Sequence, residues 1–301
     1  MKNKYLIIVI IILSIIAIIS SPNKKETAYF NADKIDVTIK DNQTKEEQNL
    51  DLEEYVIGVV AGEMPASFAE EALKAQAIAA RSYAISKIKS ATTSYDLVTD
   101  VTNQVYITEE QMQEKWQDDF TFYYTKIKEA VEATKNLVME YDGEVISAYD
   151  FAMSNGATED VSLVFGESRD YLVSVASPWD ENVKNFSVTT TFSQKKFCEK
   201  LNIDCSSIVI NDIARSSTNR VNTITINNQE FKGTTFRSLL GLRSTDFTIS
   251  IENDITITTK GYGHCVGMSQ YGANQMAKNG SSYEEILKYY YKDIDIVEIN
   301  V

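Results

Sequence analysis

Turn signals and helical segments follow one another along this chain in an order that few folds accommodate. Dipeptides typical of two-residue turns separate short strand-like runs at Asp142-Gly143, Asn227-Asn228 and Asn253-Asp254, and each predicts a β-hairpin. Helical spacing of apolar residues comes in blocks, at residues 52–60, 68–87, 125–135, 194–201, 235–240, 270–278 and 281–291. A doubly wound sheet needs regular alternation of strand and helix. The sequence therefore predicts an α+β fold, a single domain of mixed helices and hairpins.

The composition limits the classes of function. The 301 residues include 29 Lys and Arg against 43 Asp and Glu, and the formal net charge of -14 argues against nucleic acid as a partner, because phosphate binding needs clustered basic residues. Hydrophobic residues make up 44% of the chain, so it can bury a core and is not disordered. His264 is the only histidine, which excludes a zinc site built on two or three histidines.

The N-terminus predicts the location. Lysines flank an unbroken apolar run over residues 5–19. The run is short for a membrane span of about 20 residues, and its length also suits a cleaved signal peptide. We favour an uncleaved anchor, because small residues are missing at the cleavage positions and Pro22 follows directly. The predicted organisation is a transmembrane anchor or signal at 1–21, a linker at 22–33 and an extracytoplasmic catalytic domain at 34–301.

One carboxylate lies in an apolar stretch. Glu63 follows residues 59–62, which read VVAG, and precedes Met64-Pro65, where the chain must leave the helical conformation. Burial in such surroundings raises the pKa of a carboxyl group, and an acid that is protonated near neutral pH can protonate a leaving oxygen. The next helix, for which Ser67 and Glu70 predict a capping box, opposes this because its N-terminus favours the anion. The alternative is that Glu63 only caps that helix.

A glycine-rich segment around the histidine is the second candidate site. Residues 261–273 read GYGHCVGMSQYGA, and glycine lets the backbone approach a ligand or another backbone closely. His264, Ser269, Gln270 and Tyr271 bring hydroxyl, amide and aromatic groups that suit a sugar. The alternative is a tightly packed turn. A serine triad of Ser269 with His264 lacks the nucleophile-elbow pattern.

A polar loop and the cysteines complete the candidates. Residues 149–159 are rich in small polar groups, a composition that more often marks only a loop. A zinc site would need all four soft ligands, Cys198, Cys205, His264 and Cys265. The adjacency of the last two and the wide spacing of the first two argue against it. A Cys198–Cys205 disulfide suits the extracytoplasmic setting better.

At five places the sequence resembles the SpoIID/LytB family. In order along the chain, the matching segments are LEEYVIGVVAGEMP at 52–65, ALKAQAIAARSYA at 72–84, QVY at 104–106, FRSLLGLRS at 236–244 and the glycine-rich segment at 263–273. The resemblance covers most of residues 50–110, 137–180 and 230–295. Each motif alone is weak, and their common order makes the signal strong.

The resemblance implies a membrane-anchored peptidoglycan lytic transglycosylase. Such enzymes cleave the bond between MurNAc and GlcNAc without water. A single acid, which falls on Glu63, protonates the glycosidic oxygen and then accepts the proton of the MurNAc 6-hydroxyl. That hydroxyl attacks the anomeric carbon and leaves a 1,6-anhydro end, unlike the two-carboxylate plan of glycoside hydrolases. We assign substrate binding to Arg81, Tyr83, Gln104, Tyr106, Ser154, Thr158, His264, Ser269 and Gln270, although Arg81 and Tyr83 are equally compatible with helix packing.

The family acts in engulfment during endospore formation. The resemblance therefore implies a single-pass protein of the mother-cell membrane that faces the septal wall. Its expected partners are peptidoglycan glycan strands, a sporulation amidase/endopeptidase and a membrane scaffold protein. No cofactor is expected. Some relatives bind zinc, but the family's His-Ser, small residue or Cys, Ser-Gly-Gly pattern is replaced here by FAMSNG at 151–156, and its Gly-His-Gly-Val-Gly has Cys265 at the third place.

An alternative from the same family is a non-catalytic, peptidoglycan-binding enhancer of a cell-wall amidase, similar to the LytB branch. The altered loop at 151–156 would then mark lost activity, whereas Glu63 in its apolar turn favours an enzyme. A structural or adhesive surface protein would show repeats or wall-anchor signals, and the sequence has neither. The remaining helix carboxylates, Glu53, Glu54, Glu70 and Glu71, are interpreted as solvated.

Overall fold

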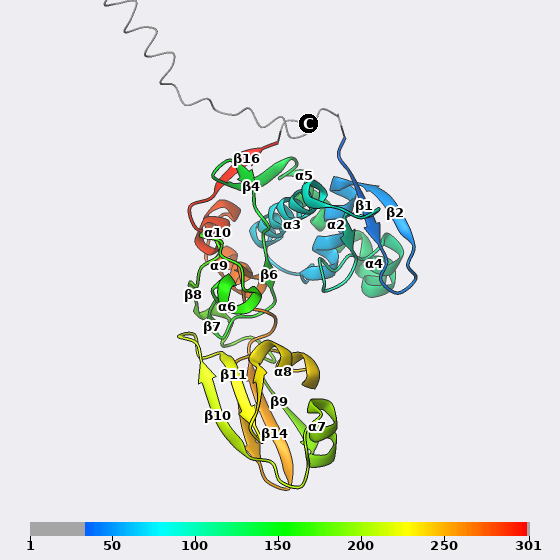
Figure 1. The fold of residues 1–301 in the computed structure, drawn as a ribbon. Coiled ribbons are helices and arrows are strands. Elements are labelled where there is room, and N and C mark those ends of the chain that lie inside the picture. The colour runs from blue at the N-terminus through cyan, green and yellow to red at the C-terminus, as the bar shows by residue number, and fades with distance from the viewer. Residues whose placement is uncertain (1–33, 300–301) are drawn as a thin grey trace, which may run out of the picture.

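Two hydrophobic cores organise the chain, one in each of the two lobes visible in Figure 1. The structure, a computed structural model, describes residues 34–299. We call residues 34–186 with 261–299 the main lobe and residues 187–260 the small lobe. The predicted anchor at 1–21 and linker at 22–33 lie outside the described residues. Within residues 34–299, no helix has the length and apolar character needed to cross a membrane.

Helices form the centre of the main lobe and short strands lie around them (Figure 1). The helices are α2 Leu52–Glu63, α3 Glu70–Ser90, α4 Glu109–Trp116, α5 Phe120–Glu132, α6 Val161–Phe165, α9 Gln270–Lys278 and α10 Tyr283–Tyr290, with 3-10 turns η1 Gln117–Asp119 and η2 Pro178–Asp180. The strands are β1 Asp36–Lys40, β2 Glu47–Asp51, β3 Leu97–Val98, β4 Leu137–Tyr141, β5 Glu144–Val145, β6 Asp150–Phe151, β7 Gly156–Ala157, β8 Ala176–Ser177, β15 Met268–Ser269 and β16 Asp295–Glu298. Their sheets have the orders β2-β1-β3, β16-β4-β5, β15-β6 and β7-β8.

Helix α3 is the central element of this lobe. It contacts α2, α5, α9, α10 and β4. Six of its alanines are fully buried, and their small side chains allow neighbours to approach from several directions (Ala72, Ala75, Ala77, Ala79, Ala80 and Ala84). The α2–α3 pair, which carries Glu63 at its bend, is therefore packed against helices and strands of the rest of the lobe.

The small lobe is a pair of three-stranded antiparallel sheets covered by two helices. Its elements are β9 Ser187–Ser193, α7 Gln194–Leu201, β10 Ile210–Arg215, β11 Val221–Ile226, β12 Gln229–Lys232, α8 Gly233–Leu240, β13 Phe247–Ile251 and β14 Asp254–Lys260. The sheet orders are β10-β11-β12 and β13-β14-β9. Phe197, Phe236 and Phe247 fill the core between helices and sheets.

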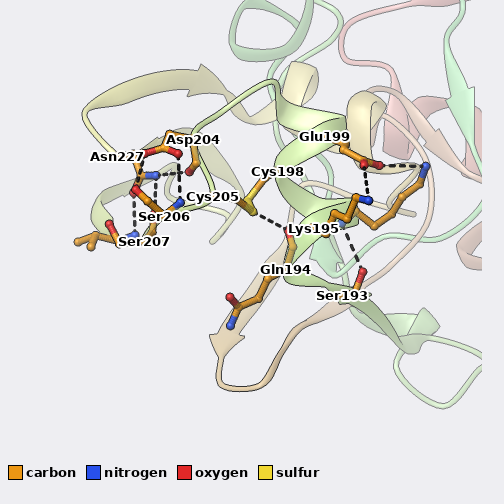
Figure 2. Close-up of a disulfide and its surroundings, with 12 residues drawn as sticks. Ser193, Gln194, Lys195, Cys198, Glu199, Asp204, Cys205, Ser206, Ser207 and Asn227 are labelled. Carbon is orange, nitrogen blue, oxygen red and sulfur yellow. Dashed lines mark hydrogen bonds and ion pairs between the residues drawn. A yellow bond between two sulfur atoms is a disulfide. The ribbon is translucent and has the colours of Figure 1, made fainter.

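A disulfide closes the segment that follows α7. Cys198 and Cys205 are joined, with their Cα atoms 5.8 Å apart, as the sequence favoured (Figure 2). The Asn227 side chain holds the same segment by donating to the backbone carbonyls of Asp204, at 3.0 Å, and Ser207, at 2.7 Å. The tip of the β11–β12 hairpin and the end of α7 are thereby tied together.

The mixed helix-and-strand composition agrees with the predicted class, and the three hairpins are confirmed. Asn227 and Asn228 both have positive φ, 50° and 60°, as a two-residue turn of the right twist requires. The strand after Asp142-Gly143 is short, since β5 ends at Val145.

Two local predictions at helix starts were wrong. Ser67 does not cap α3: the helix begins at Glu70, its N-cap is Ala69, and Asn274 of α9 accepts the Ala69 N–H at 2.8 Å. Helix α10 begins at Tyr283 rather than at 281, and its capping box is formed by Ser282 with Glu285. In α3 a contact from a distant helix sets the first residue. In α10 two adjacent serines could each act as the N-cap, and a shift of one residue at a helix end is common.

Candidate functional site

Two glycines on α2 allow a loop to lie directly on that helix. A Cβ atom at Gly62 would come within 2.3 Å of the Val105 carbonyl oxygen, and one at Gly58 within 2.2 Å of the Tyr106 ring. Ile107 N–H also donates to the Gly58 carbonyl at 3.2 Å. The close approach brings the backbone of residues 105–107 beside Glu63, the last residue of α2.

The Glu63 carboxylate is held on both oxygens. Val105 N–H donates to Oε1 at 2.7 Å. Gln270 Nε2 lies 3.4 Å from Oε2 and donates at 2.8 Å to Oδ1 of Asp150. One amide nitrogen thus contacts two carboxylates that lie far apart in the sequence. Glu63 does not cap α3, so the structure removes that alternative reading.

Burial and the second carboxylate both favour the protonated form of Glu63. Burial, followed by the charge of Asp150, raises the Glu63 pKa to about 7, against the opposing effect of the Val105 and Gln270 hydrogen bonds. Burial also raises the pKa of Asp150, while Gln270 and the nearby Gln76 amide favour its anion. Among the described residues, neither polar atom of the buried Gln76 side chain has a hydrogen-bond partner of ordinary geometry, so its effect on Asp150 comes from proximity. The pair holds a proton near neutral pH, as a general acid requires.

The glycine-rich segment packs on another backbone rather than opening onto solvent along its length. Strand β15 pairs in parallel with β6, so that Met268 lies opposite Asp150. Tyr262 and Met153 exchange backbone hydrogen bonds of 2.8 and 3.0 Å. At Gly267, where φ is +77°, a Cβ atom would lie 1.9 Å from the Tyr149 carbonyl oxygen. This packing places Gln270, at the start of α9, beside Asp150.

His264 lies next to this carboxylate pair and is neutral at physiological pH. Burial, then the nearby Arg237 cation, lowers its pKa to about 4, against a hydrogen bond to the Asp150 backbone. Nδ1 accepts the Val266 N–H at 3.1 Å. The ring stands among Tyr149, Phe151 and Phe165, with centroids 5.4 to 6.0 Å away. His264 is placed to shape the site, not to carry a charge.

Three predicted binding residues support the loop over Glu63. Gln104 Oε1 accepts the Tyr55 hydroxyl at 3.0 Å, and Tyr55 stacks on Tyr106 with a centroid distance of 5.7 Å. The Tyr83 hydroxyl accepts Asn103 Nδ2 at 3.1 Å. Both Gln104 and Tyr83 are buried. Their contacts fix the segment that delivers the Val105 N–H.

Three other predicted residues lie in the network behind the site. Ser269 Oγ donates to Asp180 Oδ2 at 2.7 Å, and Ser154 N–H donates to the same oxygen at 2.6 Å. Thr158 Oγ1 accepts the Val175 N–H at 2.8 Å. All three predicted residues are fully buried. They join the polar loop to the start of α9 and to η2.

Arg81 is not brought to the site. Its guanidinium is fully buried and forms a two-pronged pair with Glu53, at 2.8 and 2.7 Å, and it donates to the Leu137 carbonyl at 3.0 Å. The interpretation of Glu53 as solvated was wrong, because this carboxylate is the counter-ion of Arg81. Glu71 is likewise engaged, since it accepts from Lys74 and from the Tyr283 backbone.

The polar loop at 149–159 connects the two lobes. Asn155 Nδ2 donates to the Thr218 carbonyl and to Asp246, each at 2.8 Å. Glu159 accepts Ser216 Oγ at 2.6 Å and is also bonded by Thr218, and buried Arg220 donates to the Ala157 carbonyl at 2.7 Å. Asn155, which lies in the segment 151–156 that differs from the family pattern, is thus one of the residues that hold the small lobe against the loop.

Asp150 is the functional candidate that the sequence reasoning missed. It stands within a loop-like polar stretch, and only its pairing with β15 brings it to Glu63. The one local signal is the aromatic pair Tyr149 and Phe151 on either side, which predicts a short buried strand around a carboxylate.

The four soft ligands considered for zinc do not meet. Cys198 and Cys205 share the disulfide of the small lobe, whereas His264 and Cys265 belong to the main lobe. Among residues 34–299, no group of three or more histidine, cysteine or acidic side chains is arranged to hold a metal ion.

Comparison with known proteins places these residues in a family context. The sequence model of a family described as "SpoIID: Stage II sporulation protein" matches residues 40–141. "Stage II sporulation protein D" of Bacillus subtilis (strain 168) is 38% identical over 290 residues, which cover 94% of this chain and 84% of that protein. The Bacillus amyloliquefaciens protein of the same name is 42% identical over 259 residues, covering 83% and 75%. "Amidase enhancer" of Bacillus subtilis (strain 168) is 31% identical over 296 residues, which cover 78% of this chain but 39% of that protein.

Proposed function

The chain belongs to the SpoIID family of stage II sporulation proteins, and on that premise we propose that it is a lytic transglycosylase that cleaves the MurNAc–GlcNAc bonds of peptidoglycan. The observation that carries the proposal is the Glu63 carboxyl group, whose pKa is raised to about 7 beside Asp150 and Gln270. A group with this pKa can both give and take a proton at neutral pH.

In the proposed reaction Glu63 performs two proton transfers. The Val105 N–H fixes Oε1, so the carboxyl group keeps one orientation while Oε2 faces Gln270. The protonated carboxyl group gives its proton to the glycosidic oxygen as the C1–O bond breaks. The resulting carboxylate then takes the proton of the MurNAc 6-hydroxyl as that oxygen bonds to C1. The product is a 1,6-anhydro end, and the proton count of Glu63 is restored.

Asp150 supports the same cycle from the other side of Gln270, whose amide nitrogen contacts both carboxylates. Its negative charge raises the proton affinity of Glu63 and favours positive charge that develops on the sugar ring. Gln270 holds both carboxylates with one nitrogen, so the two keep their relative position when the proton leaves.

Product analysis tests the proposal. Denuded glycan strands are incubated with the full-length chain in mild non-ionic detergent, as wild type, Glu63→Gln and Asp150→Asn, and the ends are identified by mass spectrometry. Anhydro-MurNAc ends from wild type but not from Glu63→Gln are the expected result. Reducing MurNAc ends would instead indicate a hydrolase that uses Asp150 as its second carboxylate.

The second candidate is a non-catalytic enhancer of a cell-wall amidase. The similarity to "Amidase enhancer" favours it, although that similarity covers 39% of the relative. A wild-type chain that is folded and binds glycan, yet yields no new ends, would shift the assignment to this candidate. Stimulation of a purified amidase by wild type and by Glu63→Gln alike would then establish it.

We also propose the setting implied by the family. The chain would act in engulfment during endospore formation, anchored in the mother-cell membrane by residues 1–21, with a sporulation amidase/endopeptidase and a membrane scaffold protein as partners. Fractionation of sporulating cells tests the anchor: the chain should sediment with membranes and be released when residues 1–21 are deleted.

A further inference from the structure

A small pocket is lined in part by His264 and does not include Glu63 or Asp150 in its lining. It has a volume of about 260 Å³ and lies between α6 and α8. Its lining residues are Val164, Phe165, Thr234, Arg237, Thr245 and His264. His264 also lies near the Asp150 backbone, so this residue is common to the pocket and to the surroundings of the Glu63 site.

Arg237 is the one cationic residue among those that line this pocket. Nε is occupied, since it donates to the carbonyls of Leu242 and Arg243, each at 3.2 Å. Among the described residues no acceptor bonds to Nη1 or Nη2, and no carboxylate pairs with Arg237. The hydrogen bonds of Nε thus orient the side chain. The two terminal nitrogens, Nη1 and Nη2, remain available, and a pair of guanidinium nitrogens matches the two oxygens of a carboxylate.

The other walls fit a small anion attached to an apolar group. Thr234 and Thr245 supply hydroxyl donors, and neutral His264 adds no charge that would compete. Phe165, 44% exposed, gives an apolar wall that a sugar ring or a methyl group can contact. The adjoining cavity of about 380 Å³ shares this wall but has its own charged residues: Arg220 lies 4.0 Å from Glu159, and Lys232 is outside the lining of the Arg237 pocket.

This local charge is opposite to that of the whole chain. A protein of net charge -14 gains nothing from long-range attraction to an acidic polymer, so an anionic substrate needs a cation within contact distance. Arg237 is such a cation, and it lies close to His264.

We propose that the Arg237 pocket binds a carboxylate carried by the muramic acid unit of the substrate. The inference rests on the proposed glycan substrate. Two sources have this chemistry: the lactyl carboxylate of denuded MurNAc, and a carboxylate of an attached stem peptide. In both cases the ion pair fixes the MurNAc residue, and with it the 6-hydroxyl, relative to Glu63. A strand of GlcNAc alone lacks the group.

Binding to a catalytically silent chain tests this pocket independently of turnover. In the full-length Glu63→Gln background, dissociation constants are measured by calorimetry for three probes of equal length: denuded glycan, peptide-bearing glycan and a neutral chitooligosaccharide. Adding Arg237→Gln should weaken binding of a carboxylate probe about tenfold or more, as expected for loss of a charged hydrogen bond, and leave the chitooligosaccharide unchanged. The probe that responds identifies the source of the carboxylate.

Two further variants keep the test decisive. Lys232→Gln removes the same charge from the adjoining cavity and should leave all three dissociation constants unchanged. Thr234→Val removes a pocket hydroxyl group from an exposed position. If Arg237→Gln does not fold, this variant replaces it, and it should weaken binding of the carboxylate probe but not of the chitooligosaccharide. Equal weakening of all three probes, or equal effects of Lys232→Gln and Arg237→Gln, would overturn the proposal. Anhydro products from wild type together with such a result would leave the transglycosylase assignment intact.

Discussion

At the scale of single residues, Gln270 is the side chain on which the site depends. Its one amide nitrogen contacts Glu63 and Asp150, which reach it from α2 and β6. Glu63 could be selected from sequence because its apolar neighbours predict burial. Asp150 could not, because nothing local indicates that residues 268–269 pair beside it. A long-range parallel pair leaves no periodic signal in so short a strand.

The first prediction concerns the pH profile. The charge of Asp150 raises the pKa of Glu63, so Asp150→Asn should lower that pKa. Since the acid must be protonated to act, kcat/KM of wild type should fall as pH rises through about 7, and this fall should move to lower pH in the variant. Glu54→Gln, at an exposed carboxylate on the same helix, should not move it. An alkaline limb that stays in place in Asp150→Asn would contradict the coupling.

The second prediction concerns stability. Because the folded-state pKa of Glu63 is above its ordinary value of 4.5, the favourable contribution of its protonated form is complete below about 4.5 and is lost as pH rises through about 7. Glu63→Gln should therefore be more stable than wild type at pH 8, by on the order of 3 kcal/mol, and no different at pH 4. Urea unfolding at both values measures this. A variant less stable than wild type at pH 8 would refute the burial argument.

The third prediction separates structure from binding at Arg81. Glu53→Ala leaves a buried guanidinium without its counter-ion, which should cost about 3–5 kcal/mol of unfolding free energy. Glu54→Ala, exposed one residue further on, should change it by less than about 0.5 kcal/mol. If Arg81 holds only the fold, glycan affinity of the folded Glu53→Ala chain should match wild type. A specific loss of affinity at unchanged stability would restore Arg81 as a binding residue.

At the scale of elements, the turns could be predicted, as could the starts of α2, α7 and α9, whereas the start of α3 could not. A hairpin such as that at Asn227-Asn228 is set by the backbone preferences of two residues, so local sequence suffices. The start of α3 is set by Asn274 of α9, which is distant in sequence. Helix α4 was missed although Thr108 and Gln111 form a capping box at its start, a signal present in the sequence.

The fourth prediction concerns the contact of α2 with the loop at 105–107. Gly62→Ala would place a Cβ atom 2.3 Å from the Val105 carbonyl oxygen, so the loop must move and the Val105 N–H must leave Glu63. We expect kcat to fall about tenfold or more, since small displacements of a reacting group are costly. Ser67→Ala, exposed beside the same bend, is the control. Full activity in Gly62→Ala would show that the Val105 hydrogen bond is dispensable.

At the scale of the whole molecule, the two separate hydrophobic cores lead us to expect that local damage in one lobe leaves the other unaffected. The Cys198–Cys205 disulfide lies in the small lobe and the Glu63 site in the main lobe. The fifth prediction is that Cys198→Ser with Cys205→Ser destabilises the small lobe by about 2–3 kcal/mol, as expected for a short closed loop. Hydrogen exchange should accelerate in β9 and α7 and stay unchanged in α3. Uniform acceleration through both lobes would show a single cooperative unit.

The way the small lobe joins the main lobe has a consequence for how such genes can change. The chain leaves and returns through two paired strands, with Ser187 opposite Lys260, and the next residue, Gly261, donates to the Phe186 carbonyl. Segments between these two points can be lengthened, trimmed or exchanged by recombination without shifting the frame that carries Glu63. An exchanged segment must still bring partners for Asn155 and Glu159, so the inheritance of Thr218 and Arg220 should be linked to that of the loop at 149–159.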